Sequence, residues 1–144
     1  MFKTILLPID LEQDGSWGRA LSVAARIAKQ EGARLHLVTV IQVPPAIVAQ
    51  YLPSGYEGAA TKAAAASLEA IAGNVDIGEG SVTTHVLHGV PYREILKEAE
   101  RIGAELIVLE SNRPGMGHFL LGSNAARIVR HARCSVFVLR SGDR

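Results

Sequence analysis

Short apolar runs alternate with helical segments along this chain, and that alternation constrains its fold more than any other feature. The first run, residues 2–9, is too continuously apolar for a half-exposed strand and suits one that is covered on both faces. Pro8 has no backbone N–H to donate, so we expect it where pairing ends, with Ile9 and Asp10 directly beyond. The segment therefore predicts a central strand that delivers a carboxylate to one edge of a sheet.

The rest of the chain continues the same alternation. Four further strands are predicted at residues 34–41, 81–87, 105–109 and 135–140, which are short, apolar and rich in β-branched side chains. Four helices are predicted at residues 16–29, 62–72, 91–102 and 122–132, and glycines at 32 and 103 mark the ends of two of them. Loops are expected at 42–56, long enough for a lid or a variable insertion, and at 110–121.

This order of elements predicts the fold class. Parallel neighbours in a sheet need crossover connections, which are nearly always right-handed. Five strands alternating with four helices therefore predict an α/β fold, with a doubly wound five-stranded parallel sheet and helices on both faces. A length of 144 residues, of which 48% are hydrophobic, suits a single domain over residues 1–144.

The N-terminal segment and the cysteine content indicate the compartment. The apolar run near the N-terminus is interrupted by Asp10, too early for a secretory signal or a membrane span. Cys134 is the only cysteine, so no internal disulfide can form, which agrees with a reducing environment. We expect a cytoplasmic protein whose partners include neither nucleic acid nor a membrane.

The first turn of the last predicted helix is the strongest local signal for a ligand. Gly122 and Ser123 open this helix, and Asn124 follows them. A helix start offers unpaired N–H groups and a partial positive charge, and Gly122 lets an anion approach the backbone closely. The pattern predicts a phosphate site, an ordinary helix cap by Ser123, or both roles together.

Charged residues near the same predicted sheet edge fit an anionic ligand in part. Residues 1–110 carry 9 Lys and Arg against 13 Asp and Glu, whereas residues 111–144 carry 6 Arg against one Asp. Arg113 suits a phosphate as a bidentate donor, and His118 lies in the same loop. Asp10 suits ribose hydroxyls, or else caps a turn with Gln13 or Asp14. Scattered arginines on a solvated helix are the alternative interpretation of the basic excess.

Metal binding and covalent catalysis find no support in the sequence. The five histidines show no ligand spacing, and His85 and His88 would point to opposite faces of one strand. No nucleophile elbow, no Walker loop and no cysteine with an obvious base is present. Only Asp10 or His118 could act as a base, so we predict no catalytic residue and at most a slow hydrolytic activity.

Several segments together resemble a known family. They are Ile5-Leu6-Leu7-Pro8-Ile9-Asp10, His88-Gly89-Val90-Pro91 with Ile95, Ala104-Glu105-Leu106-Ile107-Val108, Leu120-Leu121-Gly122-Ser123, and residues 129–136, VRHARCSV. In this order they resemble the universal stress proteins along the whole chain, most closely the F and G branch. The resemblance implies a fold of the adenine nucleotide alpha hydrolase type.

The resemblance also implies a ligand and an assembly. The ligand would be ATP or another adenine nucleotide, with or without magnesium, held where strands one and four end and hydrolysed slowly at most. The positions implied for it are Asp10 toward the ribose, with Pro8 and Ile9 beside it, the backbone around Val40 toward the adenine, Leu109 to Ser111 toward the sugar and phosphates, and Gly122, Ser123 and Asn124 toward the phosphates. A homodimer would form through the closing strand, residues 135–140, whose apolar edge would otherwise stay open.

One departure from the family pattern leaves two functions open. Nucleotide-binding members carry Gly-x-x-Gly, nine residues, and then Gly-Ser or Gly-Thr. Here Glu110 and Arg113 replace the two glycines, and eight residues separate Arg113 from Gly122. In the first, Arg113 replaces the phosphate-binding backbone of the glycine loop, and the protein is a nucleotide-binding sensor or scaffold. In the second, the protein is a nucleotide-free homodimeric interaction module.

Overall fold

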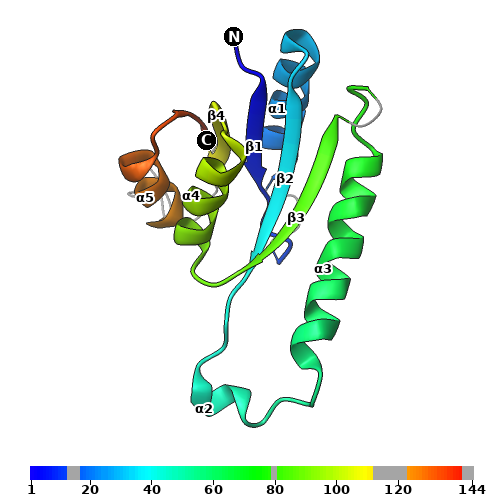
Figure 1. Cartoon of the computed structure of the whole chain (residues 1–144), viewed down its shortest axis with the longest axis vertical. Coiled ribbons are helices and arrows are strands. Elements are labelled where there is room, and N and C mark those ends of the chain that lie inside the picture. The colour runs from blue at the N-terminus through cyan, green and yellow to red at the C-terminus, as the bar shows by residue number, and fades with distance from the viewer. Residues whose placement is uncertain (13–16, 79–80, 112–122, 141–144) are drawn as a thin grey trace.

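The computed structural model describes residues 1–12, 17–78, 81–111 and 123–140, and these form a five-stranded sheet with helices on both faces (Figure 1). All strands are parallel and lie in the order β3-β2-β1-β4-β5. The strands are β1 (Thr4–Pro8), β2 (Arg34–Ile41), β3 (Val82–His88), β4 (Leu106–Ser111) and β5 (Ser135–Arg140). The helices are α1 (Gly18–Glu31), α2 (Ala46–Ala49), α3 (Tyr56–Gly73), α4 (Pro91–Ile102) and α5 (Ser123–His131). The predicted α/β class and doubly wound parallel sheet are confirmed.

Two apolar layers cover the two faces of the sheet. On one face, the alanines of α1 and Leu68 of α3 pack against Ile5 and Leu7 of β1 and their neighbours on β2 and β4. On the other face, α4 and α5 pack against the alternate residues of the same strands, including Leu6. Because β1 is covered on both faces, its residues 5 to 7 are fully buried, as its continuous apolar run predicts.

The glycines predicted as helix stops act as such. Gly32 and Gly103 follow α1 and α4 with φ of 66° and 68°, a left-handed conformation that is strained for residues with a Cβ. Pro91 opens α4, where its missing N–H costs nothing. Pro8 is the last residue of β1, and the next amide, Ile9 N–H, donates to Val38 O at 2.7 Å.

The predicted helix at 62–72 and the predicted loops were partly wrong. Helix α3 begins six residues earlier, at Tyr56, because Glu57 favours a helix N-terminus and the alanines that follow outweigh Gly58. The loop at 42–56 contains the short helix α2, started by Pro45. Strand β4 continues through Glu110 and Ser111, which pair with Leu139 and Arg140 of β5, so these two residues are not in a loop.

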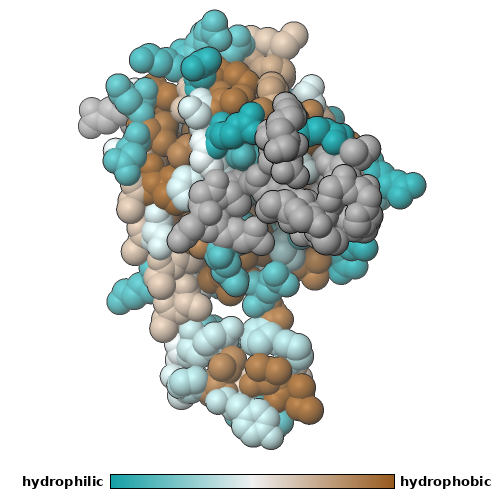
Figure 2. Space-filling view, turned by 180° about the vertical axis from the view of Figure 1, so that it is seen from behind, coloured by the Kyte–Doolittle hydropathy of each residue, from teal (hydrophilic) through white to brown (hydrophobic). Residues whose placement is uncertain are grey.

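Helix α2 and the first turns of α3 project beyond the end of the sheet (Figure 1). Apolar side chains are exposed there, with Ile47 at 70% and Tyr51 at 82% exposure, and Figure 2 shows the apolar atoms at the tip of this projection.

No helix in the described parts of the chain is both long and apolar enough to cross a bilayer.

A polar cluster between the sheet and α4 was not predicted. His36 Nδ1 of β2 lies 3.0 Å from His85 Nε2 of β3, and His85 Nδ1 lies 3.3 Å from a carboxylate oxygen of Glu98. Arg101 donates to the same carboxylate through Nε at 2.8 Å and also through Nη2. His88 points to the opposite face, where its Nε2 lies 2.8 Å from Thr61 Oγ1, as the alternation of strand side chains predicts.

The pKa values of His36 and Glu98 in this cluster are both lower than usual, for different reasons. Desolvation lowers the pKa of His36 below its ordinary value of 6.5, and the charges of His85, Arg34 and Arg101 lower it further against the opposing effect of Glu98. The hydrogen bond from Arg101 lowers the pKa of Glu98 below 4.5, despite the burial of that carboxyl group. Both groups therefore bind protons more readily in the unfolded chain than in the folded protein.

We predict that the free energy of unfolding decreases as the pH falls below about 6.5, the unfolded pKa of His36. The contribution of His36 is complete above that pH and is lost as the pH falls toward its folded pKa. Glu98 contributes to acid unfolding only at pH values below 4.5. Urea unfolding between pH 7.5 and 5.5 therefore follows the titration of His36 and avoids that of Glu98.

The variant His36→Gln should flatten this pH dependence. The variant His131→Asn removes an exposed histidine at the end of α5 and should keep the wild-type slope. Equal slopes in the wild type and in His36→Gln would contradict the assignment to His36.

Candidate functional site

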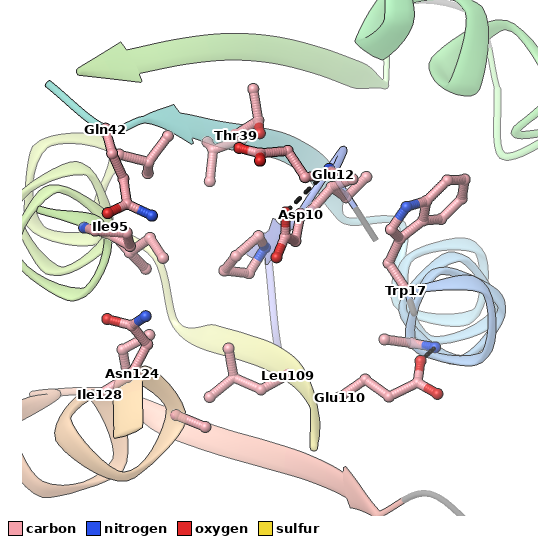
Figure 3. A pocket seen from close by; sticks show the side chains of 17 residues that line it. Asp10, Glu12, Trp17, Thr39, Gln42, Ile95, Leu109, Glu110, Asn124 and Ile128 are labelled. Carbon is pink, nitrogen blue, oxygen red and sulfur yellow. Dashed lines mark hydrogen bonds between the residues drawn. The ribbon is translucent and has the colours of Figure 1, made fainter. Parts of the chain in front are cut away.

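A cavity of about 220 Å³ lies where β1, β2 and β4 end (Figure 3). Three helices begin beside the cavity. It is lined by Trp17, the N-cap residue of α1, by Ala20 of α1, by Pro91 and Ile95 of α4, and by Asn124 of α5. The cavity sits at the point where the order of strands reverses, between β1 and β4. In open α/β sheets this crevice beyond the carboxyl ends of the strands is where ligands bind.

Apolar side chains form the inner wall of the cavity. Val38, Ile95, Leu109 and Ile128 contribute to it, and all four are at least 94% buried. Val40 lies at the end of β2, two residues beyond Val38 on the same strand. An apolar wall with a few polar groups at its edge is typical of a pocket for a flat organic ligand.

Asp10 lies at the rim, where it makes a tight turn with its own segment. Its Oδ1 accepts a hydrogen bond from the backbone N–H of Glu12 at 3.0 Å (Figure 3). This is the turn-capping role that the sequence offered as an alternative, with Glu12 as a partner. Gln13 and Asp14, the partners expected from the sequence, lie outside the described residues. The turn uses one carboxylate oxygen, and the side chain still lines the cavity.

Glu110 has a structural role that sequence analysis missed. Its Oε1 accepts a hydrogen bond from the backbone N–H of Ala20, in the first turn of α1, at 2.9 Å. Trp17, at the N-cap position of α1, provides no side-chain cap. The carboxylate therefore caps α1 from a strand 90 residues away, and it lies at the positive end of that helix.

Asn124 caps a helix in the same way on the opposite side of the cavity. Its side-chain Oδ1 accepts a hydrogen bond from the backbone N–H of Tyr92 at 3.2 Å, in the first turn of α4. The side-chain oxygen is therefore occupied by α4, and the Nδ2 group is the donor that remains for a ligand. One amide in the first turn of α1 and one in the first turn of α4 are thus each paired with a side chain from another element.

Trp17 brings an unsatisfied donor to the cavity. Its indole nitrogen is buried and has no hydrogen-bond partner among the described residues. The side chain lines the cavity between Glu12 and Glu110, with its nitrogen-bearing edge toward Asp10 (Figure 3). A buried N–H group without an acceptor costs free energy, so this edge favours a ligand oxygen. The sequence indicated only that Trp17 is an apolar position of α1.

The predicted site residues are brought together in part. Pro8, Ile9, Asp10, Val40, Leu109 and Asn124 line the cavity. Ser111 does not line it and is buried at the end of β4, opposite Arg140. Arg113, Gly122 and His118 lie outside the described residues, as does the side chain of Ser123.

The charges around the cavity differ from what the basic C-terminal segment suggested. Asp10, Glu12 and Glu110 line it, whereas no Lys, Arg or His does so within the described ranges. Arg127 instead stacks over the Tyr92 ring, with its Cζ 4.8 Å from the ring centroid. Across the parts of the chain that the structure describes, no cluster of three or more His, Cys, Asp or Glu side chains is arranged to hold a metal ion.

Solved structures of low sequence identity share this fold. Hypothetical protein MJ0577 superposes with a TM-score of 0.83 at 23% identity, covering 100% of this chain and 99% of its own. A universal stress protein in complex with cAMP has a TM-score of 0.65 at 22% identity, with 96% of each chain covered. The universal stress protein from Archaeoglobus fulgidus in complex with dAMP has a TM-score of 0.62 at 19% identity, covering 94% of this chain and 96% of its own.

Sequence comparison extends the likeness from fold to family. Universal stress protein G of Salmonella typhimurium is 30% identical over 144 residues, covering 97% of this chain and all of the relative. Residues 1–140 match the universal stress protein family as a whole. The chain therefore belongs to the universal stress protein family.

Proposed function

We propose that this protein binds an adenine nucleotide in the cavity at the ends of β1 and β4 and acts as a cytoplasmic stress-response sensor or scaffold. The observation that carries the proposal is the convergence of three helix N-termini on one apolar-walled cavity. The complexes of related structures with cAMP and dAMP support the choice of ligand class.

The capping pattern favours α5 as the phosphate-binding helix. Glu110 accepts one amide in the first turn of α1, and Asn124 accepts one amide in the first turn of α4. In this proposal the amides that open α5, beside the Nδ2 group of Asn124, bind the phosphate, because a helix start attracts an anion. Gly122, Ser123 and Arg113 would complete the phosphate site in this proposal.

The rest of the ligand then has a place along the cavity. The adenine would lie against the apolar wall near Val40 and Leu109, and backbone groups of β2 would form hydrogen bonds with the edge of the base. The ribose would lie near Pro8, Ile9 and Asp10. Among the described lining residues no side chain is arranged as a nucleophile with a base, so we propose binding rather than catalysis.

Thermal denaturation with ATP, ADP or AMP tests this proposal. A ligand present at a hundredfold excess over its Kd adds about 2.7 kcal/mol to the free energy of unfolding, which raises the Tm by roughly 5–10 °C for a protein of this size. Gly122→Asp places a negative charge and a side chain at the start of α5 and should abolish the shift.

Gly58→Asp is the matched control for this experiment. It adds the same charge to the first turns of α3, where an added Cβ meets open space and no part of the cavity. This variant should keep the nucleotide-dependent shift. A shift that persists in Gly122→Asp would refute the proposed phosphate position.

An exposed strand supports a second candidate, a homodimeric interaction module that needs no nucleotide. Strand β5 is the last strand of the sheet and pairs with β4 alone in the described structure. Phe137 lies on the opposite face of β5 from Val136 and Val138, which pack against the α4 and α5 layer, and it is 40% exposed. An apolar edge strand favours pairing with a second copy, and we propose a homodimer through residues 135–140.

Sedimentation velocity tests the dimer separately from nucleotide binding. We expect the wild-type protein to sediment as a dimer, and Phe137→Lys to shift it toward the monomer, because a charge on an edge strand opposes pairing. Lys62→Glu, on α3 and away from β5, should leave the dimer intact. A monomeric wild-type protein at micromolar concentrations would contradict the proposed assembly.

A further inference from the structure

We propose that Glu110 makes this site selective for adenosine ligands with a single phosphate and disfavours nucleoside triphosphates. This inference rests on the proposed function, because it concerns the specificity of the same cavity. Its basis is the placement of the Glu110 carboxylate and the set of charges and donors around the cavity.

The first argument concerns the N-terminus of α1. Helix N-termini are the natural anion sites of a doubly wound sheet, and α1 follows the central strand β1 directly. Here the Oε1 atom of Glu110 already accepts the Ala20 N–H at 2.9 Å. A ligand phosphate at α1 would therefore meet the repulsion of an anion that belongs to the protein itself.

The second argument concerns charge. Asp10, Glu12 and Glu110 bring three carboxylates to the cavity, where no basic side chain of the described ranges lies, and the proposed function assigns a single cation, Arg113, to the phosphate. Repulsion between like charges increases with each further phosphate on the ligand. A cyclic monophosphate or a simple monophosphate carries the least charge that can still use the first turn of α5.

The third argument concerns the hydrogen-bond donors that remain. The Trp17 indole N–H is buried without a partner among the described residues, and the Asn124 Nδ2 group faces the cavity beside α5 (Figure 3). Both donors are neutral. Together with Arg113, the one cation that the proposed function assigns to the phosphate, they can satisfy the oxygens of one phosphate and a sugar, but a single positive charge does not neutralise a triphosphate chain.

The position of Glu110 in the cavity agrees with the other three arguments. Glu110 stands at the end of β4 and closes the side of the cavity toward α1 (Figure 3). The β- and γ-phosphates of a triphosphate would have to extend past it or out of the cavity.

Calorimetric titration with cAMP, AMP and ATP, in the presence of a chelator, tests this inference on the wild type and on Glu110→Gln. The glutamine keeps an oxygen that can accept the Ala20 N–H, so α1 stays capped while the charge is removed. We expect the wild type to bind AMP and cAMP at least about tenfold more tightly than ATP, and Glu110→Gln to narrow that ratio by roughly tenfold.

Glu100→Gln is the matched control, because Glu100 is an exposed carboxylate on α4 that does not line this cavity. Its ratio of AMP to ATP affinity should equal that of the wild type. Equal affinities for AMP and ATP in the wild type, or an unchanged ratio in Glu110→Gln, would overturn the specificity assigned to Glu110 and leave nucleotide binding intact. Absence of binding by all three ligands would overturn the proposed function and this inference together.

Discussion

The placement of β4 beside β1 is the constraint from which the site arises. Strands β2 and β3 extend the sheet on one side of β1, and β4 and β5 extend it on the other, so the crossover helices cover opposite faces. In a parallel sheet every crossover helix starts near the carboxyl edge. At the reversal point the first turns of α1, α4 and α5 therefore come together over a crevice that no strand fills.

Capping then distinguishes these three helices from one another. A buried or half-buried helix start needs partners for its free N–H groups, and here two partners come from other elements, Glu110 for α1 and Asn124 for α4. The same contacts that hold the helices onto the sheet thus decide where an anion can bind. Stability and specificity depend on the same side chains at this edge, and Trp17 adds a donor that lacks a partner within the described structure.

Sequence patterns predicted the strands, the fold class and the position of Asp10, because each depends on local periodicity or on a proline or glycine at a fixed place. They did not predict contacts between distant segments. Glu110 and Ala20 are 90 residues apart, and His36 and His85 are 49 apart, so no local spacing connects them. In the sequence, Glu110 in place of a glycine indicated only the loss of a phosphate-binding backbone position. Its hydrogen bond to the first turn of α1 is apparent only in the assembled fold.

Backbone amide chemical shifts, followed during a titration with AMP, test the central claim most directly. The account predicts that the largest changes occur at Asp10, Val40, Asn124 and Ala125, where the ends of β1 and β2 meet the first turn of α5. The amides of Tyr56, Ala60 and Ala63 on α3, which line a neighbouring hollow but not this cavity, should change little. Changes centred on these α3 amides, or none at all at saturating AMP, would contradict a nucleotide site at the reversal point of the sheet.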